Sequence, residues 1–73
     1  MTKENEKSII AKFHPEAVDF VTSIIKEVYE KEWGVGKDQL ATSLLKLSDG
    51  SLDKLLSYFP IVDPRDIIME VAM

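Results

Sequence analysis

The sequence predicts an all-α fold: a small single-domain bundle of four short helices, or of five if residues 9–13 are also helical. Two observations predict it. Apolar side chains recur at three- and four-residue steps through most of the chain. No segment shows the strict apolar–polar alternation of a half-buried strand. With 73 residues and no cysteine, the chain suits one domain without disulfides, which must be stabilised by helix packing or by association with another chain.

The N-terminal residues 1–8 are polar and are expected to form a frayed tail, followed by a single helical domain over residues 9–73. The apolar segment Ile9–Phe13 is too short for its periodicity to separate a helix from an extended cover over the core. Both conformations stay open for these five residues.

The strongest helical pattern runs from Pro15 to Trp33. Proline suits the first turn of a helix, where its missing N–H has no partner to lose. One apolar stripe follows at helical spacing, formed by Ala17, Val18, Val21, Ile24, Ile25, Val28 and Tyr29. On the other face, Lys26–Glu30 and Glu27–Lys31 have the four-residue spacing of helical ion pairs. Gly34 stands where a left-handed C-terminal cap is expected.

Two leucine-rich helices should follow, from Lys37 to Leu47 and from about Gly50 to Phe59, joined at Asp49-Gly50. Together they predict a helix-turn-helix-like corner at residues 38–59. Pro60 ends the second of these helices, since proline cannot continue a helix.

The last helix is predicted over Pro64–Ala72. Asp63 has a capping side chain, Pro64 suits the first helical position, and Asp66 would lie near the positive end of the helix dipole. These three residues together form a local helix-start signal.

A helix-turn-helix nucleic-acid-binding protein is the alternative function that this corner suggests. The net charge is −4, and no third of the chain is basic. The second helix of the corner would present outward Asp49, Ser51, Asp53, Lys54, Ser57 and Tyr58. Carboxylates facing phosphates are repelled, and neither Arg nor Asn is present to bind base edges. Nucleic-acid binding is therefore disfavoured.

Catalytic and ligand-binding patterns are weak. His14 is the single histidine and lies beside Pro15, without an identifiable nucleophile. Gly34-Val35-Gly36-Lys37 lacks the preceding strand and the Ser/Thr of a phosphate-binding loop. Residues 49–53 lack the full calcium-loop pattern. We therefore expect no enzymatic activity, cofactor, metal site or small-molecule ligand.

No apolar run approaches the roughly 20 residues of a membrane helix, and no signal-peptide pattern is present. We therefore expect a cytoplasmic location and no membrane association.

Two features favour a protein partner. Trp33 ends the long helical pattern beside a glycine loop, where an aromatic ring can be an interface anchor, although a core position is the simpler interpretation. The C-terminal helix carries more apolar residues than one face can bury, which implies local cover, fraying or another chain. The candidate partner-binding residues are Trp33, Tyr58, Phe59, Ile68, Met69, Val71 and Met73.

The sequence thus predicts a small helical protein–protein interaction or regulatory module without catalytic activity. Its partner would be another protein or its own copy, in a homodimer. The acidic balance of the chain favours a basic partner surface.

Overall fold

The computed structural model describes residues 1–72, which form five α-helices and one 3₁₀ turn and contain no strand. The all-α prediction is confirmed. The elements in chain order are α1 (Lys3–Lys12), the 3₁₀ turn η1 (Pro15–Ala17), α2 (Val18–Tyr29), α3 (Lys37–Ser48), α4 (Leu52–Ser57) and α5 (Pro64–Ala72).

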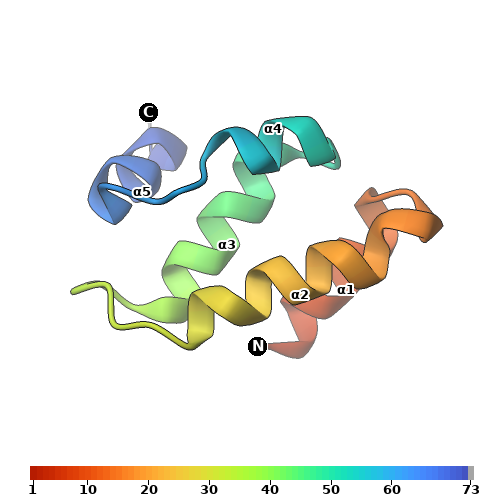
Figure 1. Ribbon diagram of the computed structural model, residues 1–73, viewed down its shortest axis with the longest axis horizontal. Coiled ribbons are helices and arrows are strands. Elements are labelled where there is room, and N and C mark those ends of the chain that lie inside the picture. Colours follow the sequence, from red (N-terminus) through yellow and green to blue (C-terminus); the bar gives the residue numbers. More distant parts are fainter. Residues whose placement is uncertain (73) are drawn as a thin grey trace.

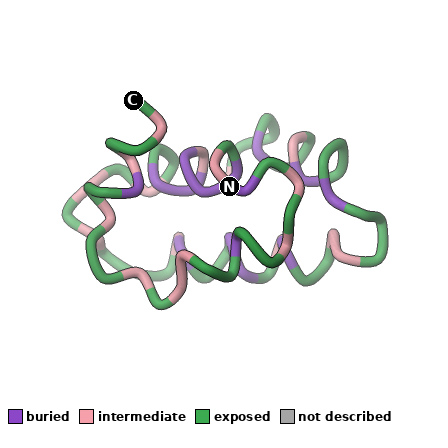
Figure 2. The backbone as a smooth tube through the Cα atoms, turned by 90° about the horizontal axis from the view of Figure 1, so that it is seen from above, coloured by how far each residue is buried: buried purple, intermediate pink, exposed green. Residues whose placement is uncertain are grey.

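Helix α3 is the centre of the fold. It contacts each of the other four α-helices, and Figure 1 shows it running between α1 and α2 on one side and α4 and α5 on the other. Leu40, Ala41 and Leu44 on α3 are fully buried. In Figure 2 the buried positions recur at intervals along the longer helices, with exposed positions between them. One apolar core therefore holds all five helices together.

The N-terminal segment differs from the frayed tail expected over residues 1–8, because α1 begins at Lys3. The Thr2 side chain caps the helix by accepting a hydrogen bond from the Asn5 backbone N–H at 3.1 Å. Asn5 is itself buried, and its Oδ1 accepts a hydrogen bond from Thr42 Oγ1 on α3 at 3.2 Å. Ile9 is also fully buried. Residues 9–12 belong to α1, which gives the bundle its fifth helix, whereas Phe13 is extended.

Helix α2 is shorter than the helix predicted over residues 15–33. The chain enters through η1, where His14 Nδ1 accepts a hydrogen bond from the Glu16 N–H, and α2 ends at Tyr29. Gly34 has a left-handed φ of 76° but lies in the loop after α2 and is not its cap. The ion pairs expected between residues 26 and 30 and between 27 and 31 are not formed within 4.0 Å, because residues 30 and 31 lie beyond the helix.

The corner between α3 and α4 forms at Asp49-Gly50, as predicted. Both residues have positive φ, 45° and 86° respectively, and Ser51 caps α4 by accepting a hydrogen bond from the Lys54 N–H at 3.2 Å. A Cβ at Gly50 would lie 2.5 Å from the carbonyl oxygen of Lys12. Lys12 Nζ also lies 3.5 Å from Asp49 Oδ1. The end of α1 therefore packs directly against the corner.

Tyr29 joins α2 to α3, since its hydroxyl donates a hydrogen bond to Asp38 Oδ1. Burial, and then this hydrogen bond, raise the pKa of Tyr29 from 10.0 to about 12. The folded protein therefore holds the phenolic proton more tightly than the unfolded chain does. This contribution to stability is complete below pH 10 and is lost as the pH rises to about 12.

We therefore expect Tyr29→Phe to reduce the loss of stability between pH 10 and 12. Urea unfolding curves, followed by circular dichroism across this interval, measure the free energy of unfolding of the wild type and of the variant. The free energy of the wild type minus that of the variant should fall as the pH rises from 10 to 12. A difference that stays constant through the interval would contradict the raised pKa.

A candidate protein-binding groove

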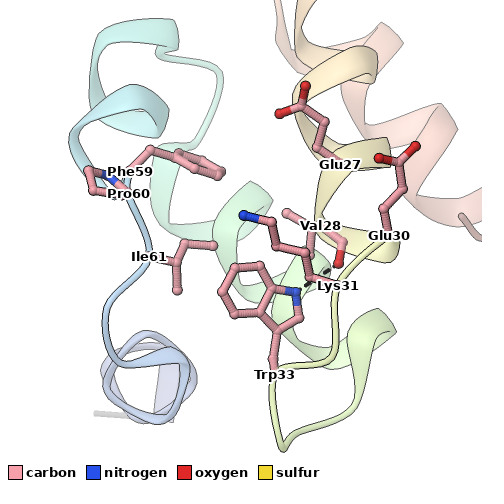
Figure 3. Close-up of a pocket in the computed structure, with 8 residues that line it drawn as sticks. All are labelled: Glu27, Val28, Glu30, Lys31, Trp33, Phe59, Pro60 and Ile61. Carbon is pink, nitrogen blue, oxygen red and sulfur yellow. Dashed lines mark hydrogen bonds between the residues drawn. The ribbon is translucent and has the colours of Figure 1, made fainter.

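A surface groove of about 480 Å³ lies between the C-terminal end of α2 and the segment that joins α4 to α5. Figure 3 shows that its walls come from residues far apart in the sequence. The lining residues are Glu27, Val28, Glu30, Lys31, Trp33, Phe59, Pro60 and Ile61.

Trp33 forms one wall because its side chain points back toward the end of α2. Its Nε1–H donates a hydrogen bond to the carbonyl oxygen of Val28 at 2.8 Å, as the dashed line in Figure 3 shows. That carbonyl belongs to the last turn of α2, where carbonyl groups lack helical partners. The bond fixes the indole at the end of the helix. The ring is half-buried, with part of its surface in the groove.

The opposite wall is the short segment Phe59-Pro60-Ile61. Helix α4 ends at Ser57, and the Phe59 N–H still donates to the carbonyl oxygen of Leu56 at 3.0 Å. Pro60 then takes the chain out of the helix, because it has no N–H to continue the pattern. Phe59 and Ile61 are half-buried, so the groove has apolar surface on both sides.

Three charged side chains, all exposed, lie at the rim of the groove: Glu27, Glu30 and Lys31. Lys31 Nζ lies 5.7 Å from the centroid of the Trp33 ring, within the range of a cation–π contact. In Figure 3 the ammonium group extends over the indole toward Phe59. Within residues 1–72, none of the three has an oppositely charged side chain within 4.0 Å. The rim carboxylates are therefore available to an incoming cation.

The other predicted partner-binding residues do not share this groove. Tyr58 and Met69 line a hollow beside α5, and the Tyr58 hydroxyl donates to Glu70 Oε2 at 3.0 Å. Burial, and next this bond, raise the pKa of Tyr58 above 10.0. Ile68 and Val71 line a third hollow, against α3. Met73 lies outside the described residues. Of the predicted residues that the structure describes, only Trp33 and Phe59 meet at the groove.

Much of the apolar excess of the C-terminal helix is covered within the chain. Helix α5 packs on α3, with Ile67 buried and Ile68 and Val71 half-buried. Met69 remains 61% exposed. Helix α5 therefore leaves one large apolar side chain mostly in solvent within its described part.

The sequence gives little sign of the other residues that complete the groove. In the sequence, Pro60 indicates only the end of a helix, and the spacing of Glu27, Glu30 and Lys31 indicates only a solvated helix face. One signal was present: Phe59-Pro60-Ile61-Val62 is an apolar run in a segment that cannot be helical. No such pattern indicates that the three charged residues line the groove, because their position there depends on where α2 ends.

Two further properties of the described residues bear on other functions. Among residues 1–72, no three His, Asp or Glu side chains are grouped so that they could hold a metal ion. In the same residues, no helix has both the length and the apolar character needed to cross a bilayer.

In comparisons with known proteins, the chain matches no protein-family model, no curated protein and no solved structure.

Proposed function

We propose that the chain is a small cytoplasmic protein-interaction module without catalytic activity, and that its groove binds a basic segment of a partner protein. The observation that carries this proposal is the meeting of two half-buried aromatic rings, Trp33 and Phe59, in one groove beside two carboxylates. The carboxylates are those of Glu27 and Glu30, which are exposed and have no ion pair within residues 1–72.

The aromatic walls supply the binding free energy in this proposal. A few aromatic side chains that become fully buried on binding dominate many interfaces. Both rings are half-buried in the free chain, so each has solvent-accessible surface that a partner can bury. Val62, which follows the Ile61 wall, is 90% exposed and extends the apolar surface beyond the groove. A partner's leucine or similar side chain can cover these groups together.

The charges favour a basic partner. Two rim glutamates and a net charge of −4 attract a cationic segment, raise its association rate and repel acidic competitors. Helix α4, the second helix of the corner, has Asp53 exposed beside Lys54. This mixed charge gives no preference for a phosphate backbone.

Trp33 is the single tryptophan of the chain, so its fluorescence reports on the groove. We expect a capped peptide of alternating leucine and arginine to change the emission saturably, with an affinity that falls as salt is added. The matched leucine–glutamine peptide should bind more weakly, and the leucine–glutamate peptide more weakly still. Phe59→Ala should weaken binding of the arginine peptide about tenfold, as for a hot-spot aromatic residue.

Met69→Ala is the matched control, because Met69 is exposed but lies away from the groove, and it should leave the affinity unchanged. Circular dichroism of each variant verifies that it is folded. Weakening by Met69→Ala and not by Phe59→Ala would overturn the proposal. So would binding of duplex DNA in place of the peptide, or sedimentation as a dimer that excludes the peptide.

A further inference from the structure

We infer that Lys31 occupies the position that a cationic side chain of the partner takes over Trp33, and that Lys31 is therefore a built-in competitor for the groove. The inference rests on the proposed function and deepens it, because it names the chemistry of the bound side chain. The occupant is a basic segment of another protein, with a guanidinium group as the preferred cation.

The position of Lys31 gives one place that a cation can occupy over the Trp33 ring. Its ammonium nitrogen lies 5.7 Å from the centroid of the Trp33 ring. The negative face of an indole attracts a cation at this distance. Phe59 lines the same groove, and Figure 3 shows the ammonium group pointing toward it from the Trp33 side. The chain itself therefore supplies an example of the contact that a partner would make.

Lys31 is also able to leave. It lies two residues beyond Tyr29, the last residue of α2, and its side chain is exposed. Its ammonium group makes no ion pair within 4.0 Å in the described part of the chain. Displacing it therefore costs little more than the exposed cation–π contact.

An arginine from a partner can replace that contact and add to it. The guanidinium plane stacks on an aromatic face while its N–H groups donate to a carboxylate, a combination that a lysine ammonium supplies less well. Glu27 and Glu30 line the groove and provide the carboxylates. Neither carboxylate lies within 4.0 Å of Lys31 Nζ, and Figure 3 shows both directed away from the indole. The exposed glutamate side chains therefore have to turn toward the partner's guanidinium, which then gains a carboxylate in addition to the indole that Lys31 has alone.

The competition determines the direction in which replacing Lys31 changes the affinity for the peptide. Lys31→Met keeps most of the apolar stem and removes the charge, so we expect it to tighten binding of the leucine–arginine peptide about threefold, in line with an exposed cation–π contact. Lys7→Met is the matched control: Lys7 is exposed on α1, does not line the groove, and its replacement changes the net charge equally. Glu30→Gln should weaken binding.

Trp33 emission measures the dissociation constant of each variant. Saturable binding with the same affinity for Lys31→Met and Lys7→Met would overturn this inference and leave the proposed function standing. Weaker binding by Lys31→Met would also overturn it, because Lys31 would then help to hold the partner. Failure of every peptide to bind the wild type would remove both proposals together.

Discussion

Replacing Leu44 by alanine is expected to lower the free energy of unfolding by about 2–5 kcal/mol. Leu44 is fully buried on α3, the helix that contacts all the others. Truncation removes apolar surface from the core and leaves a cavity that the surrounding helices fill only in part. A domain of this size is stabilised by only about 4–11 kcal/mol in total. The variant should therefore lose a large share of its stability, which urea unfolding measures.

Leu56→Ala is the control for this experiment. Leu56 has the same side chain but is 41% exposed on α4, so its truncation should cost less than about 1 kcal/mol. Equal losses from the two leucines would contradict the central position of α3 in the core.

Replacing Gly50 by alanine is expected to cost more than replacing Gly34. Both glycines have left-handed φ angles, 86° and 76°, where an L-residue costs about 1–2 kcal/mol. A Cβ at Gly34 would meet no atom within 4 Å, whereas a Cβ at Gly50 would lie 2.5 Å from the Lys12 carbonyl oxygen. That oxygen belongs to the backbone, so α1 or the corner has to move.

The difference between the two variants therefore isolates the packing of α1 against the corner. We expect Gly50→Ala to lose at least about 1 kcal/mol more than Gly34→Ala in the same unfolding assay. If the two losses are equal, α1 does not lie against the corner in solution.

The elements that could be predicted from sequence are those whose signals are local. Helix α5 has the predicted bounds, and the Asp63 side chain accepts a hydrogen bond from the Arg65 N–H at 3.1 Å, as expected of a cap. The corner at Asp49-Gly50 was equally local, because glycine tolerates the left-handed backbone that the turn requires. In both cases a few neighbouring residues determine the conformation.

Helix α1 could not be predicted because its stability comes from contacts distant in sequence. Asn5 is bonded to Thr42, 37 residues away, and Ile9 is buried in the common core. The polar composition of residues 1–8 gives no sign of the Asn5 contact, and the apolar segment that begins at Ile9 is too short for its periodicity to identify a helix. The one local signal was Thr2, whose side chain caps the helix.

The groove was only half predictable for a related reason. Trp33 and Phe59 were identified as aromatic anchors, but the sequence does not show that they face each other. Their meeting depends on the early end of α2 at Tyr29 and on the bond from Trp33 to the Val28 carbonyl. The helical spacing of the apolar stripe gives no sign of that end. From the sequence alone, the three rim charges therefore belong to a solvated helix face.

Amide chemical shifts recorded during titration with the leucine–arginine peptide test the groove most directly, because they locate the bound peptide on the fold. The largest saturable shifts should fall at residues 27–33 and at residues 59, 61 and 62, which belong to the two walls of the groove and the exposed residue beside them. The matched leucine–glutamine peptide should shift the same amides less. Shifts centred on Met69 in α5 or on α4, or shifts that do not saturate, would contradict the assignment of this groove as the binding site.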